Sequence, residues 1–598
     1  MSRRLVFILA ALALVVAAAF AAFSWTLTSS GPEAVLAQQL RKGYGLELDV
    51  KGESTLSILP TPRVKLENVN ISGLGERLSV KNATLRGELS LLPLLLGRIE
   101  LADVALSNAE TVLDARNTSD SFWASWAAWL QLRGTGNFIK KIIVSDSSLT
   151  ILREKHEDIL LDRINTVIDW PDSASPLFLS GAFSWNGKTI SITKANFLPP
   201  ALLSGGNSLF ALELSLPDSQ LALAGTIQFD KSWNATVTGK SQLKTESLKQ
   251  LTSWANLPIP LSPLIEKFSI EGDFSTTKNI ISWPQIAIAM DNNRLEGSLS
   301  FRFDAVGYTV SGTLATDALE LTPFLAPLAD LHNSGNLGLS LADINRTDLD
   351  LRLSATSSTI GQLKLSDLAL GLLVKPDRFE ATLGRVSFER GIVKGRLILS
   401  GLPPQRDMKL QANINELNLG RLFAGAGLET ALTGTAQGNL SLEGTGSSFE
   451  DILQKTHGRL SLAVTNGEFK AFSIPETLKR LGSADATGEI APQTGATPFS
   501  LARIGMIVEA GTGFITDGTI QTENARASLN GDMSLVDRTI AVSTVITPDG
   551  RTDGADVVIT ASGPWATPKT TARITEKPKT DMPVSPEDNN LPAPTQAD

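Results

Sequence analysis

Three histidines are the side chains best suited to bind a metal ion or to transfer protons near neutral pH: His156, His332 and His457. They lie far apart, and none belongs to an H-x-x-x-H or H-x-H pair, so the ligand spacing of a zinc site is missing. Adjacent carboxylates such as Glu157-Asp158 could act as acid and base. Because the chain has 62 acidic residues, such pairs are expected by chance. We interpret these histidines and carboxylates as structural or surface residues.

Motifs of common catalytic and nucleotide-binding sites are also missing from the sequence. It has no cysteine, which excludes disulfides and thiol chemistry, and no G-x-S-x-G, G-x-x-x-x-G-K-[ST] or H-E-x-x-H motif. Gly444-Thr445-Gly446 lacks the third glycine of a dinucleotide site, and we interpret it as a turn. The net charge of -9 argues against nucleic-acid binding. We predict a protein that is not an enzyme and uses no metal or cofactor.

A nine-residue phrase occurs four times and indicates the fold. It reads RVKLENVNI at residues 63–71, RIELADVAL at 98–106, KIIVSDSSL at 141–149 and QLKLSDLAL at 362–370. Apolar residues alternate, as on a strand with one buried face, until the phase shifts at an Asn or Asp. We interpret Asn68, Asp103, Asp146 and Asp367 as residues that bend the strand at a β-bulge. The irregular intervals between the copies argue against a regular solenoid.

Similar alternation continues along most of the chain and predicts strands with one apolar and one polar face. Dipeptides favoured in two-residue hairpin turns, such as Asn186-Gly187 and Asn530-Gly531, indicate antiparallel pairing. The predicted fold is therefore mainly β, with an irregular long sheet or successive sheets of the same style.

The N-terminus has the features of a membrane anchor. Arg3 and Arg4 precede an apolar stretch at residues 5–27, which as a helix would be about 35 Å long and could cross the roughly 30 Å core of a bilayer. The arginines predict a cytoplasmic N-terminus and export of the remaining chain. The alternative is a signal peptide cleaved near Ala19-Phe20-Ala21. Both interpretations place the bulk of the chain outside the cytoplasm.

Short helices are predicted between the strands. Residues 31–44 read as a helix, and SFEDILQK at 448–455 has a serine at a helix start. A second phrase, in which a strand runs into a Leu-rich helical turn, is found at TESLKQLTSW (245–254), TDALELTPFL (316–325) and INELNLGRLF (414–423). SFWASWAAWLQL at 121–132 carries Trp123, Trp126 and Trp129. We interpret it either as a helix that caps the sheet with its rings in the core, or as a helix at the membrane interface.

These features divide the chain into five predicted regions. They are a cytoplasmic N-terminus with its transmembrane anchor (1–28), an N-terminal β region with the Trp-rich helix (29–170), a middle β-sheet region (171–400), a C-terminal β region (401–574) and a disordered tail rich in Pro and acidic residues (575–598).

Two parts of the chain resemble the AsmA family. ESTLSILPTPRVKLENVNISG at 53–73, followed by LSLLPLLLGRIELADVALSNAETVLD at 89–114, is similar to the N-terminal region of that family. There a membrane anchor precedes a strand that ends in Pro, a Val-x-Leu-x-x-Val-x-Ile phrase and a Leu-x-x-Leu-Pro-Leu-Leu-x-Gly-x-Ile phrase. ALTGTAQGNLSLEGTGSSFEDILQKTHGRLSLAVTNGEFKAFSI at 431–474 resembles the C-terminal region of the family.

The resemblance implies a single-pass inner-membrane protein of a Gram-negative bacterium, with its bulk in the periplasm and a role in outer-membrane assembly and lipid homeostasis. Larger relatives, and eukaryotic chorein-type lipid-transfer proteins, look like long β-grooves lined with apolar side chains. The expected fold is then a transmembrane helix followed by elongated, twisted antiparallel sheets that form an apolar groove or open barrel, with a few capping helices. The residues expected to line the groove are Val64, Leu66, Ile99, Leu101, Leu221, Leu223, Leu349, Leu351, Leu353, Leu460 and Leu462.

Three functions follow as hypotheses. The first is a protein that binds or conducts phospholipid, or another acyl ligand, during outer-membrane biogenesis. The second is a non-enzymatic scaffold that affects targeting or folding of outer-membrane proteins, together with assembly components, with its apolar faces fully packed. The third, an envelope polysaccharide enzyme, would need clustered carboxylates that the sequence does not show.

Overall fold

The computed structural model describes most of the chain between residues 26 and 575. The described ranges are 26–28, 31–57, 61–73, 77–90, 101–116, 139–153, 157–172, 174–203, 206–230, 235–257, 259, 262–303, 307–329, 347–401, 405–427, 430, 432–470, 473–481, 490–492, 494–549, 556–565 and 567–575.

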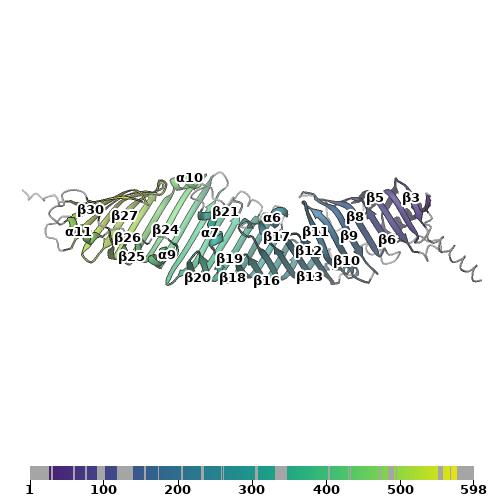
Figure 1. Cartoon of the computed structure of the whole chain (residues 1–598), viewed down its shortest axis with the longest axis horizontal. Coiled ribbons are helices and arrows are strands. Elements are labelled where there is room, and N and C mark those ends of the chain that lie inside the picture. The colour runs from purple at the N-terminus through teal and green to yellow at the C-terminus, as the bar shows by residue number, and fades with distance from the viewer. Residues whose placement is uncertain are drawn as a thin grey trace, which may run out of the picture. The chain divides into compact units, whose positions relative to one another are not determined.

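The chain forms two compact units, and almost all of the described structure is β. Unit 1 comprises Met1–Ala329, Gly338–Ser358 and Ala369–Phe379, and unit 2 comprises Asp330–Leu337, Thr359–Leu368 and Glu380–Asp598. The mainly β fold predicted from alternation is therefore confirmed. Within each unit most strands pair with the strand that precedes them, as the coloured ribbon shows (Figure 1).

The strands of unit 1 are β1 (Thr26–Thr28), β2 (Glu47–Val50), β3 (Ser54–Ser57), β4 (Arg63–Gly73), β5 (Leu78–Leu89), β6 (Leu101–Ser107), β7 (Glu110–Asp114), β8 (Lys141–Leu152), β9 (Ile159–Asp169), β10 (Leu177–Trp185), β11 (Lys188–Phe197), β12 (Ser208–Leu216), β13 (Ser219–Phe229), β14 (Ala235–Thr245), β15 (Phe268–Thr277), β16 (Ile280–Met290), β17 (Asn293–Phe303) and β18 (Tyr308–Glu320). Three strands are divided between the units: β19 (Thr347–Ile360), β20 (Leu363–Lys375) and β21 (Arg378–Phe388). Those of unit 2 are β22 (Gly391–Ser400), β23 (Arg406–Asn418), β24 (Leu432–Gly446), β25 (His457–Phe469), β26 (Thr497–Glu509), β27 (Thr512–Gln521), β28 (Ala525–Ser534), β29 (Thr539–Pro548), β30 (Asp556–Pro564) and β31 (Lys569–Thr575).

The Asn or Asp adopts a left-handed backbone conformation in three of the four copies of the nine-residue phrase, as expected of a residue that bends the strand. Asn68, Asp146 and Asp367 have φ of 49°, 48° and 52°, in the left-handed region that short polar residues tolerate best. The pairing register shifts beside Asn68 and Asp146. Asp103 instead pairs with Glu88 next to a register shift. Each bulge lets the apolar residues on both sides of it meet the same face of the sheet.

The helices are short and interrupt the run of strands. They are α2 (Gly31–Tyr44), α5 (Pro199–Leu203), α6 (Leu248–Trp254), η1 (Ser262–Leu264), α7 (Thr322–Ala329), α9 (Leu419–Gly425), α10 (Phe449–Gln454) and α11 (Ile474–Leu481). The predicted helix at 31–44 and the strand-to-helix transitions of the second phrase are confirmed in α2, α6, α7 and α9. Ser448 caps α10 by accepting a hydrogen bond from the Asp451 backbone N–H, as its position predicts.

Gly444 and Gly446 do not form the turn that we predicted. They are the last residues of β24, and α10 packs directly on them. A Cβ at Gly446 would lie 2.6 Å from the Ile452 nitrogen. The two glycines therefore provide space for a helix, which a single-sequence pattern does not distinguish from a turn.

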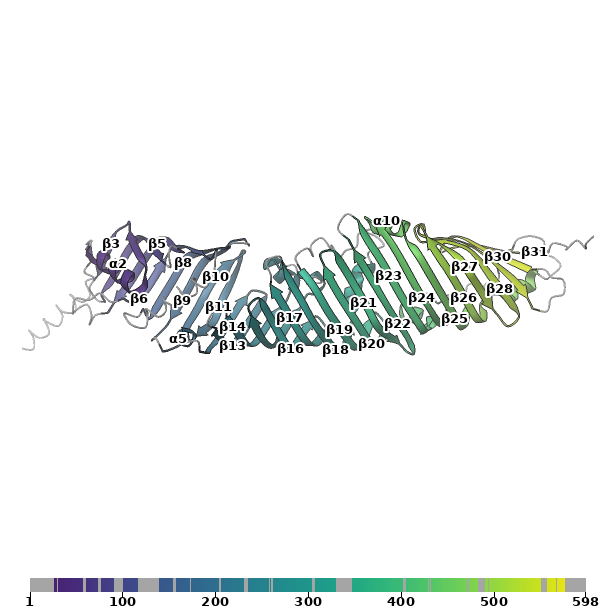
Figure 2. The same cartoon turned by 180° about the vertical axis from the view of Figure 1, so that it is seen from behind.

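Helix α2 closes the apolar face at the N-terminal end of unit 1. Its Leu36 and Leu40 are buried against Val64, Leu66 and neighbouring strand residues. The helix lies beside β3 (Figure 2). Helix α11 has the same role in unit 2, where Ile474 and Leu478 pack on strands β28 to β31. Among the described residues, no helix combines the length and the apolar character needed to cross a bilayer. Residues 5–25 of the predicted anchor lie outside the described ranges, whereas residues 26 and 27 belong to strand β1 and are not helical.

Candidate functional site

A continuous row of aliphatic side chains crosses one face of unit 1, and we call it the aliphatic row. Cross-strand pairing joins its members one to the next through seven neighbouring strands, from β11 to β17: Ile192, Leu214, Leu221, Leu243, Ile270, Ile288 and Leu295. Because directly paired residues lie on the same face of a sheet, these side chains form one uninterrupted apolar stripe. The face that carries them is called the apolar face below.

The opposite face of the same strands is polar. Residues adjacent to the aliphatic row pair into a second row, which holds four charged residues, one amide and two alanines: Lys194, Glu213, Ala222, Gln242, Glu271, Ala287 and Glu296. Lys194 Nζ lies 4.0 Å from Glu213 Oε1. The sheet therefore has the period-two segregation that the sequence predicts.

The apolar face is only partly shielded along β12 to β14, whereas Ile192 on β11 is buried. Leu214, Leu221 and Leu243 are half-buried, whereas Leu36, Leu66 and Val69 in the core closed by α2 are almost fully buried. Further along, Ile270, Ile288 and Leu295 are buried in a cluster to which strands contribute every member. In this cluster the shielding therefore comes from neighbouring strand residues. The exposed part of the half-buried leucines is apolar surface that an apolar ligand could cover.

Unit 2 repeats the arrangement on its own strands. Leu440, Leu460, Met506 and Ile515 pair in sequence across β24 to β27, and Leu462 pairs with Ile504 in the adjacent row. On the other face Lys409 pairs with Glu443, and the lysine hydrogen bond lowers the pKa of that carboxyl. Charge is again confined to one face of these strands.

The residues predicted to line a groove fall into two groups. Val64, Leu66 and Leu101 belong to the closed core beneath α2. The others lie on the apolar face of their units: Leu221 and Leu223 on β13, Leu349, Leu351 and Leu353 on β19, and Leu460 and Leu462 on β25. Of this second group Leu349 is buried and the rest are half-buried.

Several predicted residues lie outside the described ranges. They are Ile99, the possible membrane-interface residues Trp123, Trp126 and Trp129, the orientation signal Arg3 and Arg4, and the histidines His156 and His332. His457 is exposed at the start of β25. Within the described ranges, no three His, Asp or Glu side chains are grouped in a way that could hold a metal ion.

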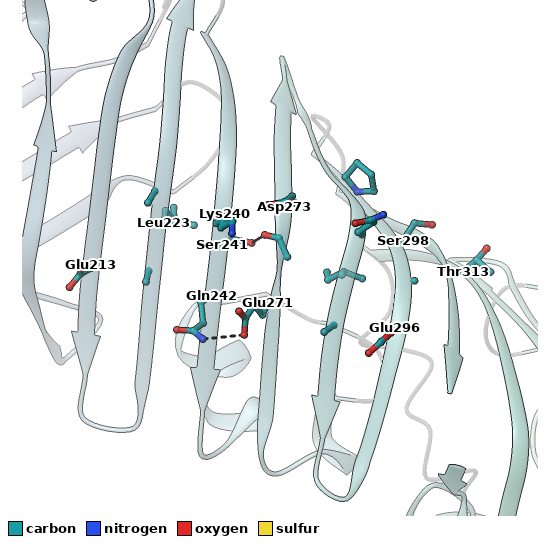
Figure 3. A pocket seen from close by; sticks show the side chains of 18 residues that line it. Glu213, Leu223, Lys240, Ser241, Gln242, Glu271, Asp273, Glu296, Ser298 and Thr313 are labelled. Atoms are coloured by element: carbon teal, nitrogen blue, oxygen red, sulfur yellow. Dashed lines mark hydrogen bonds between the residues drawn. The ribbon is translucent and has the colours of Figure 1, made fainter. Parts of the chain in front are cut away.

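A hollow of about 1000 Å³ opens on the polar side of unit 1 (Figure 3). Its charged and amide side chains come from β12 to β17, and Gln242 Nε2 donates a hydrogen bond to Glu271 Oε2 at 3.3 Å. The charged members are Glu213, Lys240, Glu271, Asp273 and Glu296. A hydrocarbon chain would have to desolvate these groups, so this hollow is unsuited to acyl chains. The candidate site is the apolar face.

A glycine pair lets two strands approach closely on the apolar face. Gly225 pairs directly with Gly239, and a Cβ on either would lie about 2 Å from a carbonyl oxygen of the facing strand: 2.0 Å from Thr238 O and 2.1 Å from Ala224 O. Any side chain here would push the strands apart. Glycines of this kind permit strong local bending of a sheet.

One contact at the edge of the apolar face was not predicted from the sequence. The ring of Trp254 in α6 packs edge-on against Trp185 at the end of β10, with centroids 4.8 Å apart. Trp254 Nε1 donates to the Trp185 carbonyl at 3.0 Å, and Asn186 Nδ2 donates to the Trp254 carbonyl at 3.1 Å. The only signal was a tryptophan at the end of each element, which does not predict a contact between them.

One protein family matches part of this chain. The sequence model of the AsmA family matches residues 332–516. Residues 332–516 are an AsmA family region. The matched residues include 431–474, which carry the C-terminal resemblance, whereas 53–73 and 89–114 lie outside the match. The search of curated proteins found no match to this chain.

Proposed function

We propose that this protein is anchored in the bacterial inner membrane, extends into the periplasm, and binds or conducts phospholipid during outer-membrane biogenesis. The observation that carries the proposal is the aliphatic row, which presents branched side chains across seven strands with no charged member. Six strand spacings of ~4.8 Å make it about 29 Å long, close to the ~30 Å hydrocarbon thickness of a bilayer.

The chemistry of the row suits an acyl chain. Each methylene removed from water contributes about 0.8 kcal/mol, and the row supplies apolar contact without directional bonds. A bound chain would therefore be held by its total contact area and could slide along the face. The lipid headgroup would remain in water. No bond is made or broken, so the proposed role needs no catalytic group.

The experiment is lipid analysis of the purified full-length protein by mass spectrometry. We expect phospholipid to copurify with the unmodified chain and to be depleted in Leu221→Arg, which places a charge in the aliphatic row. Gln220→Arg is the matched control, because Gln220 is the adjacent exposed residue on the polar face. A chain that carries no lipid, or equal depletion in both variants, would refute the proposal.

A scaffold that affects targeting or folding of outer-membrane proteins is the second candidate. It is favoured by the closed core under α2, where Val64, Leu66 and Leu101 serve packing alone. Under this alternative the purified chain would be free of lipid, while deletion of the protein would still alter the abundance of outer-membrane proteins.

A further inference from the structure

Aromatic side chains gather at one margin of the apolar face of unit 1, and we call it the aromatic margin. It is the edge at which β11, β13 and β17 end, and each of these strands ends in phenylalanine. Pairing places Phe197 opposite Phe210 and Phe303 opposite Tyr308. The full set, all at positions in register with the apolar face, is Phe197, Phe210, Phe229, Phe274, Phe301, Phe303 and Tyr308.

The rings at the β17–β18 end of this margin contact one another and reach solvent. The centroids of Phe301 and Phe303 are 4.6 Å apart, and those of Phe303 and Tyr308 are 5.8 Å apart in an edge-on arrangement. Phe303 is nevertheless 38% exposed. Packed aromatic rings at the boundary between water and an apolar surface are typical of groups that meet hydrocarbon.

Helix α6 lies along the opposite margin, and we call this helix the strap. Helix α6 begins after β14, where the Glu246 N–H donates to the Asp218 carbonyl in the β12–β13 turn, and it ends on Trp185 and Asn186 in the β10–β11 turn. Four strand spacings, about 19 Å, separate β10 from β14 along the sheet. The paired hydrogen bonds and the Trp185–Trp254 contact therefore fix α6 along this margin.

Helix α5 packs on β12 and β13 at the β11–β13 end of the aromatic margin. We infer that an acyl chain enters and leaves the apolar face of unit 1 at the β17–β18 end of this margin, and that α6 keeps the opposite margin closed. The inference rests on the proposed function, and it adds the route by which an acyl chain reaches the apolar face. Phenylalanine rings offer a passing chain apolar contact without hydrogen-bond donors. The opposite margin is occupied by a helix that hydrogen bonds hold at both ends.

The test is the rate at which the full-length chain acquires lipid. The chain, reconstituted in phosphatidylcholine nanodiscs, is mixed with vesicles that contain a phosphatidylcholine with a fluorescent acyl chain. Acquisition is followed by energy transfer to a dye on Gln220→Cys, which is unique because the protein has no cysteine. Both the rate and the final amount of bound lipid are recorded.

Phe303→Lys should slow acquisition about tenfold, because the chain must pass a charged group that resists desolvation, and should leave the final amount unchanged. Phe303→Leu, which keeps the margin apolar, should stay within about twofold of the unmodified chain. Phe178→Lys is the matched control, since Phe178 is 45% exposed but pairs with Asp169 and Asn196 on the polar face.

The strap is tested by Trp254→Ala, which should speed both acquisition and release by opening a second route. Its control is Trp565→Ala, because the Trp565 indole also donates to a backbone carbonyl, that of Thr539 at 2.9 Å, in unit 2. An unchanged rate in Phe303→Lys, or a lower final amount at the same rate, would overturn the inference. No lipid on the unmodified chain would instead refute the proposed function.

Discussion

Two leucine-to-alanine substitutions can show whether the apolar face is open. Leu66 has no exposed surface and packs in the core that α2 closes, whereas Leu221 is half-buried in the aliphatic row. Both lie on strands with the same alternating pattern. Any difference in the stability that the two substitutions remove therefore shows how well each side chain is covered.

The expected difference follows from burial. Leu66→Ala removes a fully buried side chain and leaves a cavity, so it should cost about 3–4 kcal/mol. Leu221→Ala removes a side chain that is still partly in water and leaves no enclosed cavity, so about 1–1.5 kcal/mol is expected. The two substitutions should differ by about 2 kcal/mol.

Hydrogen exchange with mass spectrometry of the full-length chain is the suitable assay, because a protein of two units need not unfold in one step. The opening free energy of amides in β4 and β13 is compared before and after each substitution. If Leu221→Ala costs as much as Leu66→Ala, the face is covered in the native protein and our account of it is wrong. If Leu66→Ala is nearly neutral, α2 does not seal the core.

Three further predictions concern the sheet and its helices. Gly239→Ala should destabilise β13–β14 by about 2 kcal/mol because its Cβ would meet a carbonyl oxygen, whereas Gly395→Ala, with its nearest contact at 3.3 Å, should cost less than half of that in the same exchange assay. Asn68→Val should destabilise the chain by about 1–2 kcal/mol in thermal unfolding because of its positive φ, and Asn68→Gly should be close to neutral. The Lys455 hydrogen bond lowers the pKa of Asp451. Exchange protection of α10 should therefore be full above the ordinary carboxyl pKa near 3.9, fall in more acidic solution, and lose this dependence in Asp451→Asn.

The bulge residues show what local sequence can predict. Asn68, Asp146 and Asp367 interrupt the alternation, and short polar residues are the ones that adopt a positive φ with least strain. The phase shift and the residue type therefore point to the same conformation, and neither depends on distant parts of the chain.

The Asn-Gly dipeptides show a limit of the same reasoning. Asn186-Gly187 forms the predicted two-residue turn, with φ of 45° and 77°. Asn530-Gly531 lies inside β28 instead, where Gly531 has a φ of 142° and pairs with Val542. Glycine permits both a turn and a kink in a strand, so the pairing of the whole strand decides between them.

The covering of the apolar face could not be predicted for a different reason. Val64 and Leu221 have the same local pattern, yet one is buried under α2 and the other is half-buried. The difference arises from where Leu36 and Leu40 dock, which is a contact between distant segments. Sequence alternation predicts which side chains share a face, and only the tertiary structure shows what lies over it.

The most direct test of the account is a photo-crosslinking scan along β13 in living cells. A photoreactive amino acid is placed in turn at Gln220, Leu221, Ala222 and Leu223 of the full-length chain, and adducts are identified by mass spectrometry. Because successive side chains point to opposite faces, phospholipid adducts should form at Leu221 and Leu223 and be absent at Gln220 and Ala222. Adducts at all four positions, or at none, would contradict a lipid-binding apolar face.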